Sequence, residues 1–307
     1  MVVFVVIAGA VNGLTWELEN IGIATYCRRL VGHKTIATSF GYIDTCSHVG
    51  WILAAFGGML LVLILPIHYL LLAIAPFALL AYFIALRAPD DHVVADIREG
   101  NPSLFCSFGK AMSEWRTWDP ALWFLGVLVF FEEIISALIF FFVPIDAYIS
   151  GANLSMVILL GILGSVPALF GYKLGKIADN RNKHTLILGG LIATAITLVG
   201  LAIFPSYYVK LIACILLGIL LEMFYMIQSS LITTLGPSKT YGQRGSFIEG
   251  ILTLGDLSAP LILGIAFDAM GFSNVVITVA ITALVLCLTY QFLRSKKAEF
   301  WIYHKAG

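Results

Sequence analysis

Apolar residues run along the chain in long unbroken stretches that short polar segments separate. The stretch WILAAFGGMLLVLIL at 51–65 is one example, and it lacks the alternating pattern that strands of a membrane barrel show. A helix needs about 20 predominantly apolar residues to cross the hydrocarbon core of a bilayer. Because backbone amides in lipid must be satisfied within the protein, we predict an all-α, polytopic membrane protein with about nine transmembrane helices. The predicted spans are residues 2–26, 38–65, 66–86, 121–149, 154–174, 185–204, 208–234, 246–270 and 274–293.

The composition fits a membrane protein and narrows the classes of function. Hydrophobic residues make up 60% of the 307-residue chain and charged residues 12%, and the mean hydropathy is +0.96. Soluble domains have roughly 45–50% apolar and ~25% charged residues. The formal net charge of zero gives no electrostatic support for nucleic-acid binding. The five cysteines are scattered without metal-ligand spacing, so we expect packing thiols and neither a metal nor a cofactor.

The 18 Lys and Arg residues fall almost entirely in alternate loops between the predicted spans. They lie in the first, third, fifth and seventh loops and in the C-terminal tail, and Lys210 alone falls on the opposite side. The positive-inside rule therefore predicts that these loops and the C-terminus are cytoplasmic and that Met1 lies outside. We expect an integral protein of the cell (plasma) membrane.

The longest polar stretch divides the predicted spans into three and then six. This division predicts a partial N-terminal helix bundle at 1–87, a cytoplasmic linker at 88–120, a C-terminal six-helix bundle at 121–294 and a cytoplasmic tail at 295–307. In the linker, Leu104, Phe108, Met112 and Trp115 recur at helical spacing. The pattern fits an interfacial helix on the inner leaflet and a merely solvated linker equally well.

Two parts of the chain resemble one another. The segment GLTWELENIGIA at 13–24 aligns with GILLEMFYMIQS at 218–229, which matches Gly13 to Gly218 and Glu17 to Glu222. Further matches follow in the same order, with SF at 39–40 against SF at 246–247. This shared order favours an internal duplication.

A loop of unusual polarity carries a family resemblance. The segment GKIADNRNKH at 175–184 resembles the cytoplasmic loop of the major facilitator superfamily, which joins the second and third helices of each six-helix half. Asn182 stands where that pattern has glycine, which leaves the tightness of the turn open. The segments at 142–170 and 242–272 are similar to the seventh, eighth and eleventh helices of the family.

The resemblance covers nearly the whole chain. It matches the spans to the fourth to twelfth helices of the family and leaves the first three without an equivalent. We therefore expect an N-terminally truncated transporter rather than a natural nine-helix variant. The resemblance implies a monomeric secondary active transporter that moves a small organic solute by alternating access. The glycine-rich segment at 41–58 weakly favours an exporter.

The resemblance also implies a gating role for the cytoplasmic loop. Its acid, here Asp179, would pair with basic groups and with the end of a neighbouring helix, and so latch the outward-open state. Asp179 is expected just past the end of its helix, Gly175 would let the neighbour approach, and Arg181 and Lys183 would begin the next helix. An alternative for Arg181 and Lys183 is a role as positive-inside anchors only.

Acidic residues within the spans occur only in helices that line the cavity or the bundle interface in this family. Those near the middle of a span cost about 2.5–3.5 kcal/mol to insert. We predict a substrate or proton site formed by Glu222 and one of Glu132 and Glu133, together with Glu17 and Tyr225. The alternative is that these acids only brace helix packing. The acids in question are Glu17, Glu19, Asp44, Glu132, Glu133, Glu222, Glu249, Asp256 and Asp268.

A second group of polar residues is expected at the interface between the bundles, namely Asp44, His48 and Asp256. Asp44 and His48 are four residues apart on one predicted helix, so their side chains can touch. The pair could relay protons, although a bracing contact is the preferred interpretation.

The distribution of charge bears on the substrate and on rival functions. The spans offer no base near their middles, which favours a neutral or cationic solute. Enzyme activity is not expected, because the aspartates at 90, 91 and 96 form a single cluster in a linker and no partner follows the acid pair at 132–133. A non-transporting receptor or scaffold, or an inactive fragment, remains the alternative.

Overall fold

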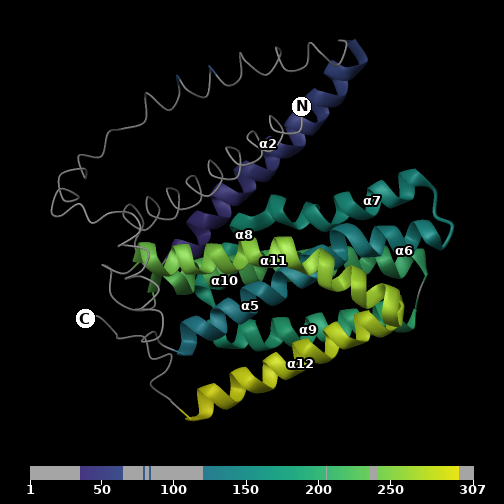
Figure 1. The fold of residues 1–307 in the computed structure, drawn as a ribbon. Coiled ribbons are helices and arrows are strands. Elements are labelled where there is room, and N and C mark those ends of the chain that lie inside the picture. The colour runs from purple at the N-terminus through teal and green to yellow at the C-terminus, as the bar shows by residue number, and fades with distance from the viewer. Residues whose placement is uncertain are drawn as a thin grey trace, which may run out of the picture. The chain divides into compact units, whose positions relative to one another are not determined.

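The computed structural model describes residues 35–64, 79, 83, 120–204, 206–234 and 241–296, and every regular element in these ranges is helical. The prediction of an all-α protein is confirmed for this part of the chain. The predicted spans at 2–26 and, apart from two residues, 66–86 lie outside it, as do Glu17, Glu19, most of the linker and most of the tail. Figure 1 shows the helices α2 (Ile36–Ile64), α5 (Pro120–Ala137), α6 (Val143–Ile149), α7 (Leu154–Ser165), α8 (Gly171–Asn180), α9 (Lys183–Ile203), α10 (Tyr207–Thr234), α11 (Tyr241–Met270) and α12 (Phe272–Lys296).

Five helical segments in the described ranges are long and apolar enough to cross a membrane. They are Pro120–Ile149, Lys183–Ile203, Tyr207–Ile232, Phe247–Met270 and Phe272–Arg294. Each coincides closely with a predicted span, because a long apolar run flanked by polar residues leaves little freedom in placing a helix in lipid. The integral membrane character is therefore supported by the fold.

One predicted span is interrupted. The stretch predicted at 154–174 forms α7, then the 3-10 turn η3 (Val166–Phe170), then α8, which continues to Asn180. Pro167 lies at the start of η3, and it lacks the N–H that an α-helix would use and restricts the residue before it. A similar interruption separates α5 from α6, where the π-helical turn η2 (Leu138–Phe142) precedes Pro144.

The chain forms two compact units, and α2 runs across the boundary between them. One unit comprises residues 1–46 and 119–307, and the other comprises residues 47–118. In the smaller unit the structure describes α2 from Ser47 to Ile64 and two further helical residues. The larger unit holds α5 to α12 together with the first part of α2.

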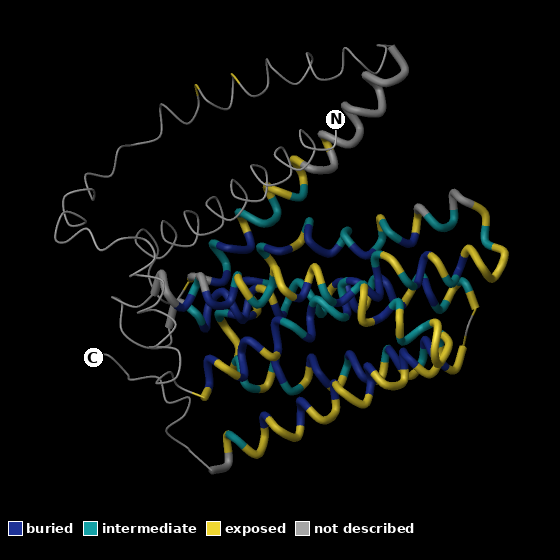
Figure 2. Tube along the Cα trace, in the orientation of Figure 1, coloured by how far each residue is buried: buried dark blue, intermediate teal, exposed yellow. Residues whose placement is uncertain are grey.

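Within the larger unit, α9 packs along α12, α11 packs along α5, and α10 contacts α7, α8 and α9. The helices α10 and α7 approach each other closely at Gly218, where an added Cβ would lie 2.4 Å from the carbonyl oxygen of Gly164. Figure 2 shows exposed residues alternating with buried ones along α12. On α11, Leu257 and Ile265 are 71% and 73% exposed. Such large exposed side chains are typical of a surface that contacts lipid.

Candidate functional site

The loop predicted to act as a gate connects α8 and α9 through only two residues. Arg181 follows α8 with an extended backbone, and Asn182 caps α9 by accepting a hydrogen bond from the N–H of His184 at 3.0 Å. Asn182 has a φ of −65°, so this turn needs no glycine. The expectation that Asp179 lies past the end of its helix was wrong, because α8 continues through Asp179 to Asn180.

Asp179 contacts the beginning of α2. Its carboxylate accepts hydrogen bonds from the N–H of Ala37 at 3.1 Å, the N–H of Thr38 at 2.8 Å and the hydroxyl of Thr38 at 2.6 Å. Ala37 and Thr38 are the second and third residues of α2, whose N–H groups have no partner within the helix. Asp179 therefore does from another helix what a capping side chain normally does, and its charge lies at the positive end of the helix dipole.

Glycines bring the backbones of α2 and α8 into contact beside Asp179. An added Cβ at Gly175 would lie 2.2 Å from the carbonyl oxygen of Ala37, and one at Gly41 would lie 2.4 Å from the carbonyl oxygen of Gly171. Two further contacts reinforce this seam. The Thr45 hydroxyl accepts the N–H of Tyr172 at 3.2 Å, and the rings of Tyr42 and Tyr172 stack at 5.4 Å.

The two basic residues of the loop differ in their surroundings. Arg181 is exposed. Lys183, the first residue of α9, donates a hydrogen bond from its ammonium group to the hydroxyl of Ser230 on α10. The neighbouring His184 shares a hydrogen bond with the hydroxyl of Tyr290 on α12. This end of the larger unit therefore joins α9, α10 and α12 through polar contacts.

Glu132 and Glu133 are adjacent on α5 but face different neighbours. Glu132 is 7% exposed, and Glu133 and Glu222 are close enough to interact with its carboxyl electrostatically. Glu133 shares a hydrogen bond with Asp256 on α11, and its stem lies against Gly255, where an added Cβ would come within 2.7 Å. Asp256, which we expected at the bundle interface, thus lies beside Glu133.

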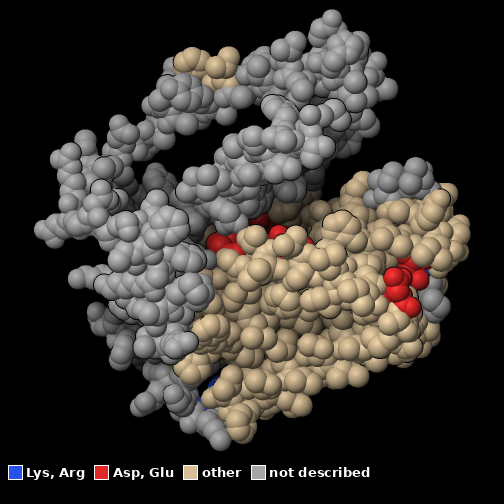
Figure 3. Space-filling model, viewed as in Figure 1, with Lys and Arg blue, Asp and Glu red and all other residues tan. Residues whose placement is uncertain are grey.

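Tyr225 links the acids on α5 and α10 to the beginning of α2. Asp44, Glu249 and Glu222 all act electrostatically on its hydroxyl, which also shares a hydrogen bond with Ser229. Residues from α2, α5, α10 and α11 therefore form one connected group, which we call the acidic cluster. Its members are Asp44, Glu132, Glu133, Glu222, Glu249 and Asp256. Figure 3 shows acidic side chains gathered midway along the described helices and again near α6.

The other predicted site residues are His48 and Glu17. His48 lies on α2 in the smaller unit, whereas Asp44 lies in the larger one. Glu17 lies outside the described residues. Within the described ranges, no group of three or more His, Cys, Asp or Glu residues is arranged to hold a metal ion.

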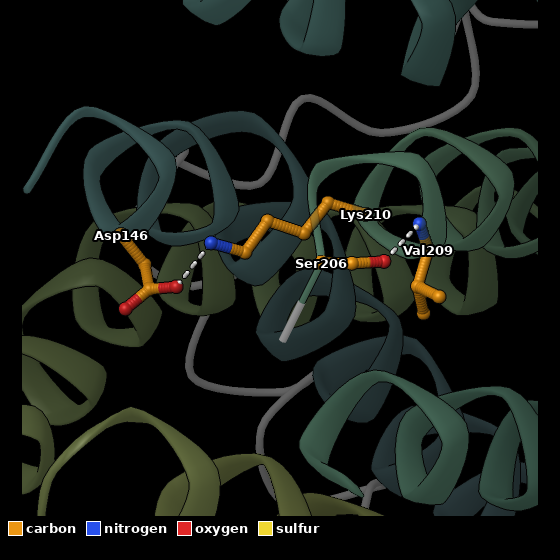
Figure 4. Close-up of polar contacts among 4 residues, drawn as sticks. All are labelled: Asp146, Ser206, Val209 and Lys210. Atoms are coloured by element: carbon orange, nitrogen blue, oxygen red, sulfur yellow. Dashed lines mark hydrogen bonds and ion pairs between the residues drawn. The ribbon is translucent and has the colours of Figure 1, made fainter. Parts of the chain in front are cut away.

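An ion pair that the sequence did not predict joins a buried lysine to a partly exposed aspartate at the other end of the helices. Lys210, only 1% exposed, contacts the carboxylate of Asp146 at 2.6 Å (Figure 4), and its ammonium lies 5.8 Å from the centre of the Phe272 ring. Lys210 is the only Lys or Arg in the spans Pro120–Ile149, Tyr207–Ile232 and Phe247–Met270. The only base in these three spans is therefore already paired with Asp146.

Gln228 was also not identified as a site residue in the sequence analysis. It is 4% exposed on α10, and its side-chain amide lies beside the Glu132 carboxyl. The only available signal was a single amide in an apolar helix, four residues beyond Phe224 and six beyond Glu222.

A comparison with protein-family models identifies a family. The model of the Major Facilitator Superfamily matches residues 1–243 of the chain. A search of curated proteins finds no match.

Proposed function

The chain belongs to the major facilitator superfamily of membrane transporters, and on this basis we propose that it is a secondary active transporter. It moves a small organic solute by alternating access and is coupled to protons. The acidic cluster, connected across α2, α5, α10 and α11, is the observation that carries this proposal. Membrane transport of a solute is the general function of the family, whereas the coupling and the site are specific to the proposal.

The chemistry of the cluster supports proton coupling. A carboxylate accepts hydrogen bonds but donates none, so Glu133 and Asp256 can share a hydrogen bond only while one of the two is protonated. Each ionised acid near the middle of a span costs about 2.5–3.5 kcal/mol. Three spans contain five cluster acids and a single base that is already paired. Protons, or a cationic solute, are the natural means of neutralising these acids.

The same charge balance favours a neutral or cationic solute. An anion would meet the carboxylates of the cluster with no free base in the spans Pro120–Ile149, Tyr207–Ile232 and Phe247–Met270 to offset the repulsion, because Lys210 contacts Asp146 at 2.6 Å. Like charges in a medium of low dielectric repel strongly. We therefore place Glu132, Glu133, Glu222 and Tyr225 at the solute and proton site.

The contact between Asp179 and α2 serves as the cytoplasmic gate in this proposal. The three hydrogen bonds of Asp179 hold the start of α2 against α8 in the state described by the structure. When the helices separate, the carboxylate and two helix N–H groups must find water instead. Such a contact is well suited to a latch with two positions, one closed and one open. Orientation with a cytoplasmic C-terminus, a plasma-membrane location and a monomeric state belong to the same proposal.

Solute flux in proteoliposomes tests the proposal. The full chain is reconstituted with a pH-sensitive dye inside, a pH gradient is imposed, and a panel of neutral and cationic solutes is added. We expect solute-dependent proton movement above that of empty liposomes. Glu222→Gln should abolish this movement, and Gly189→Ala, whose added Cβ meets nothing within 4 Å, should retain it. Proton movement that is independent of every solute, or full activity in Glu222→Gln, would contradict the proposal.

A further inference from the structure

Glu132 and Gln228 form a buried polar pair between α5 and α10. Their exposed fractions are 7% and 4%, so water reaches neither side chain freely in this state. The Gln228 side chain is close enough to the Glu132 carboxyl for a hydrogen-bonding interaction between them. However, Oε1 of Glu132 and Nε2 of Gln228 each lack a hydrogen bond of normal geometry to any described residue.

Buried polar atoms of this kind are uncommon in folded proteins, because each costs about 1–3 kcal/mol when it is left without a partner. Here one atom is an acceptor and the other is a donor, and they lie on neighbouring helices. A hydroxyl group complements both at once, since it donates to a carboxylate and accepts from an amide N–H. An ammonium group that carries a nearby hydroxyl or carbonyl does the same and adds a charge. A carboxylate, sulfonate or phosphate offers acceptors only and would be repelled by Glu132.

We propose that Glu132 and Gln228 form a solute-binding subsite that takes a hydroxyl-bearing neutral group or an amino-alcohol group and rejects anions. The subsite rests on the proposed transport function and specifies its chemistry. The proposal also gives the two adjacent glutamates different roles, because Glu133 interacts with Asp256 on α11. Glu132 then contacts the solute, and Gln228 determines specificity beside it.

Cysteine labelling tests the subsite without knowledge of the natural solute. Gln228→Cys is introduced into the full chain after its five cysteines are replaced. The protein in liposomes is treated with methanethiosulfonates that carry a hydroxyethyl, a trimethylammonium-ethyl or a sulfonatoethyl group. Each rate is divided by the rate of the same reagent with a small free thiol. The matched control is Ile219→Cys, which is 36% exposed and lies about 180° around α10 from position 228.

We expect Gln228→Cys to react with the hydroxyethyl and trimethylammonium reagents. The normalised rate of the sulfonate should be at least about 10-fold lower, given the strength of charge interactions at low dielectric. Adding Glu132→Gln should remove most of this difference, because the repelling charge is gone. Ile219→Cys should show no charge preference that depends on Glu132, since it lies on the opposite side of α10.

A folded Gln228→Cys protein that reacts with no reagent, or a charge preference that Glu132→Gln leaves unchanged, would overturn the subsite. If Gln228→Cys does not fold, Tyr225→Cys replaces it, because Tyr225 lies about one turn earlier on α10. Tyr225→Cys must then show the same preference, and its absence is equally decisive. Labelling does not depend on transport, so the two proposals can fail separately. If solute flux is observed in proteoliposomes but labelling shows no charge preference, only the proposed subsite is contradicted. If labelling shows the charge preference but no solute flux is observed, the proposed transport function is contradicted.

Discussion

The contact between α2 and α8 depends on the absence of a side chain at Gly175. In Gly175→Ala the new Cβ would lie 2.2 Å from the carbonyl oxygen of Ala37, 2.7 Å from its carbonyl carbon and 2.9 Å from the Cα of Thr38. All three atoms belong to the backbone of α2, so no flexible side chain can move out of the way. The two helices must separate instead.

The required separation can be worked out from these distances. Ordinary contact begins at 3.4 Å, so the closest pair must move apart by 3.4 − 2.2 = 1.2 Å. The bonds from Ala37 and Thr38 to Asp179 are 3.1 and 2.8 Å long, and N–H to O bonds rarely exceed about 3.2 Å. A hydrogen bond to a charged group contributes about 1.5–3 kcal/mol. The loss of even one should favour the open contact about 10-fold.

Hydrogen exchange of the Ala37 and Thr38 amides measures this change directly. In Gly175→Ala we expect these two amides to exchange at least about 10-fold faster than in the unaltered protein. Gly189→Ala adds the same methyl group where nothing lies within 4 Å, and it should leave their exchange unchanged. Equal protection of Ala37 and Thr38 in both variants would refute the reasoning, because it would mean that the close approach does not hold the contact together.

Two further predictions concern charged groups. Asp179→Asn keeps the size of the side chain but loses its charge. Hydrogen exchange of the Ala37 amide should therefore become faster, while the melting temperature of the bundle changes little. A large fall in melting temperature with unchanged exchange would contradict this prediction. Lys210→Met leaves Asp146 without its partner at 2.6 Å and should destabilise the larger unit by about 3 kcal/mol, measured by thermal unfolding. The double variant Lys210→Met with Asp146→Leu should recover most of that loss, and failure to do so would argue against the ion pair as the cause.

The boundaries of the long helices could be predicted because lipid imposes a simple rule on sequence. A run of about 20 apolar residues between polar ends fits one membrane-spanning helix, and α9, α10 and α12 begin and end within three residues of their predicted limits. The interruption at Pro167 was harder to predict, because a proline can kink a helix, end it or begin a 3-10 turn. The surrounding helices decide among these outcomes.

The contacts of the site could be predicted less well than its members. The mid-span acids were identified because each is costly in lipid, and this cost is a property of the residue itself. Two of the three partners of Asp179 are backbone N–H groups of a helix more than 140 residues away, which no side-chain pattern indicates. Gln228 was missed because an amide carries no charge, although burial makes its hydrogen bonds equally important. The pairing of Lys210 with Asp146 joins separate spans and depends on the packing between them.

The central claim is that the acidic cluster faces a water-accessible centre of a transporter and not the acyl chains. A nitroxide spin label at Tyr225→Cys, in a chain free of other cysteines, tests this claim in a reconstituted bilayer. The account predicts frequent collisions with a water-soluble nickel chelate and few with oxygen, which concentrates in lipid. Frequent collisions with oxygen and almost none with the nickel chelate, as expected for a label that contacts lipid, would contradict it.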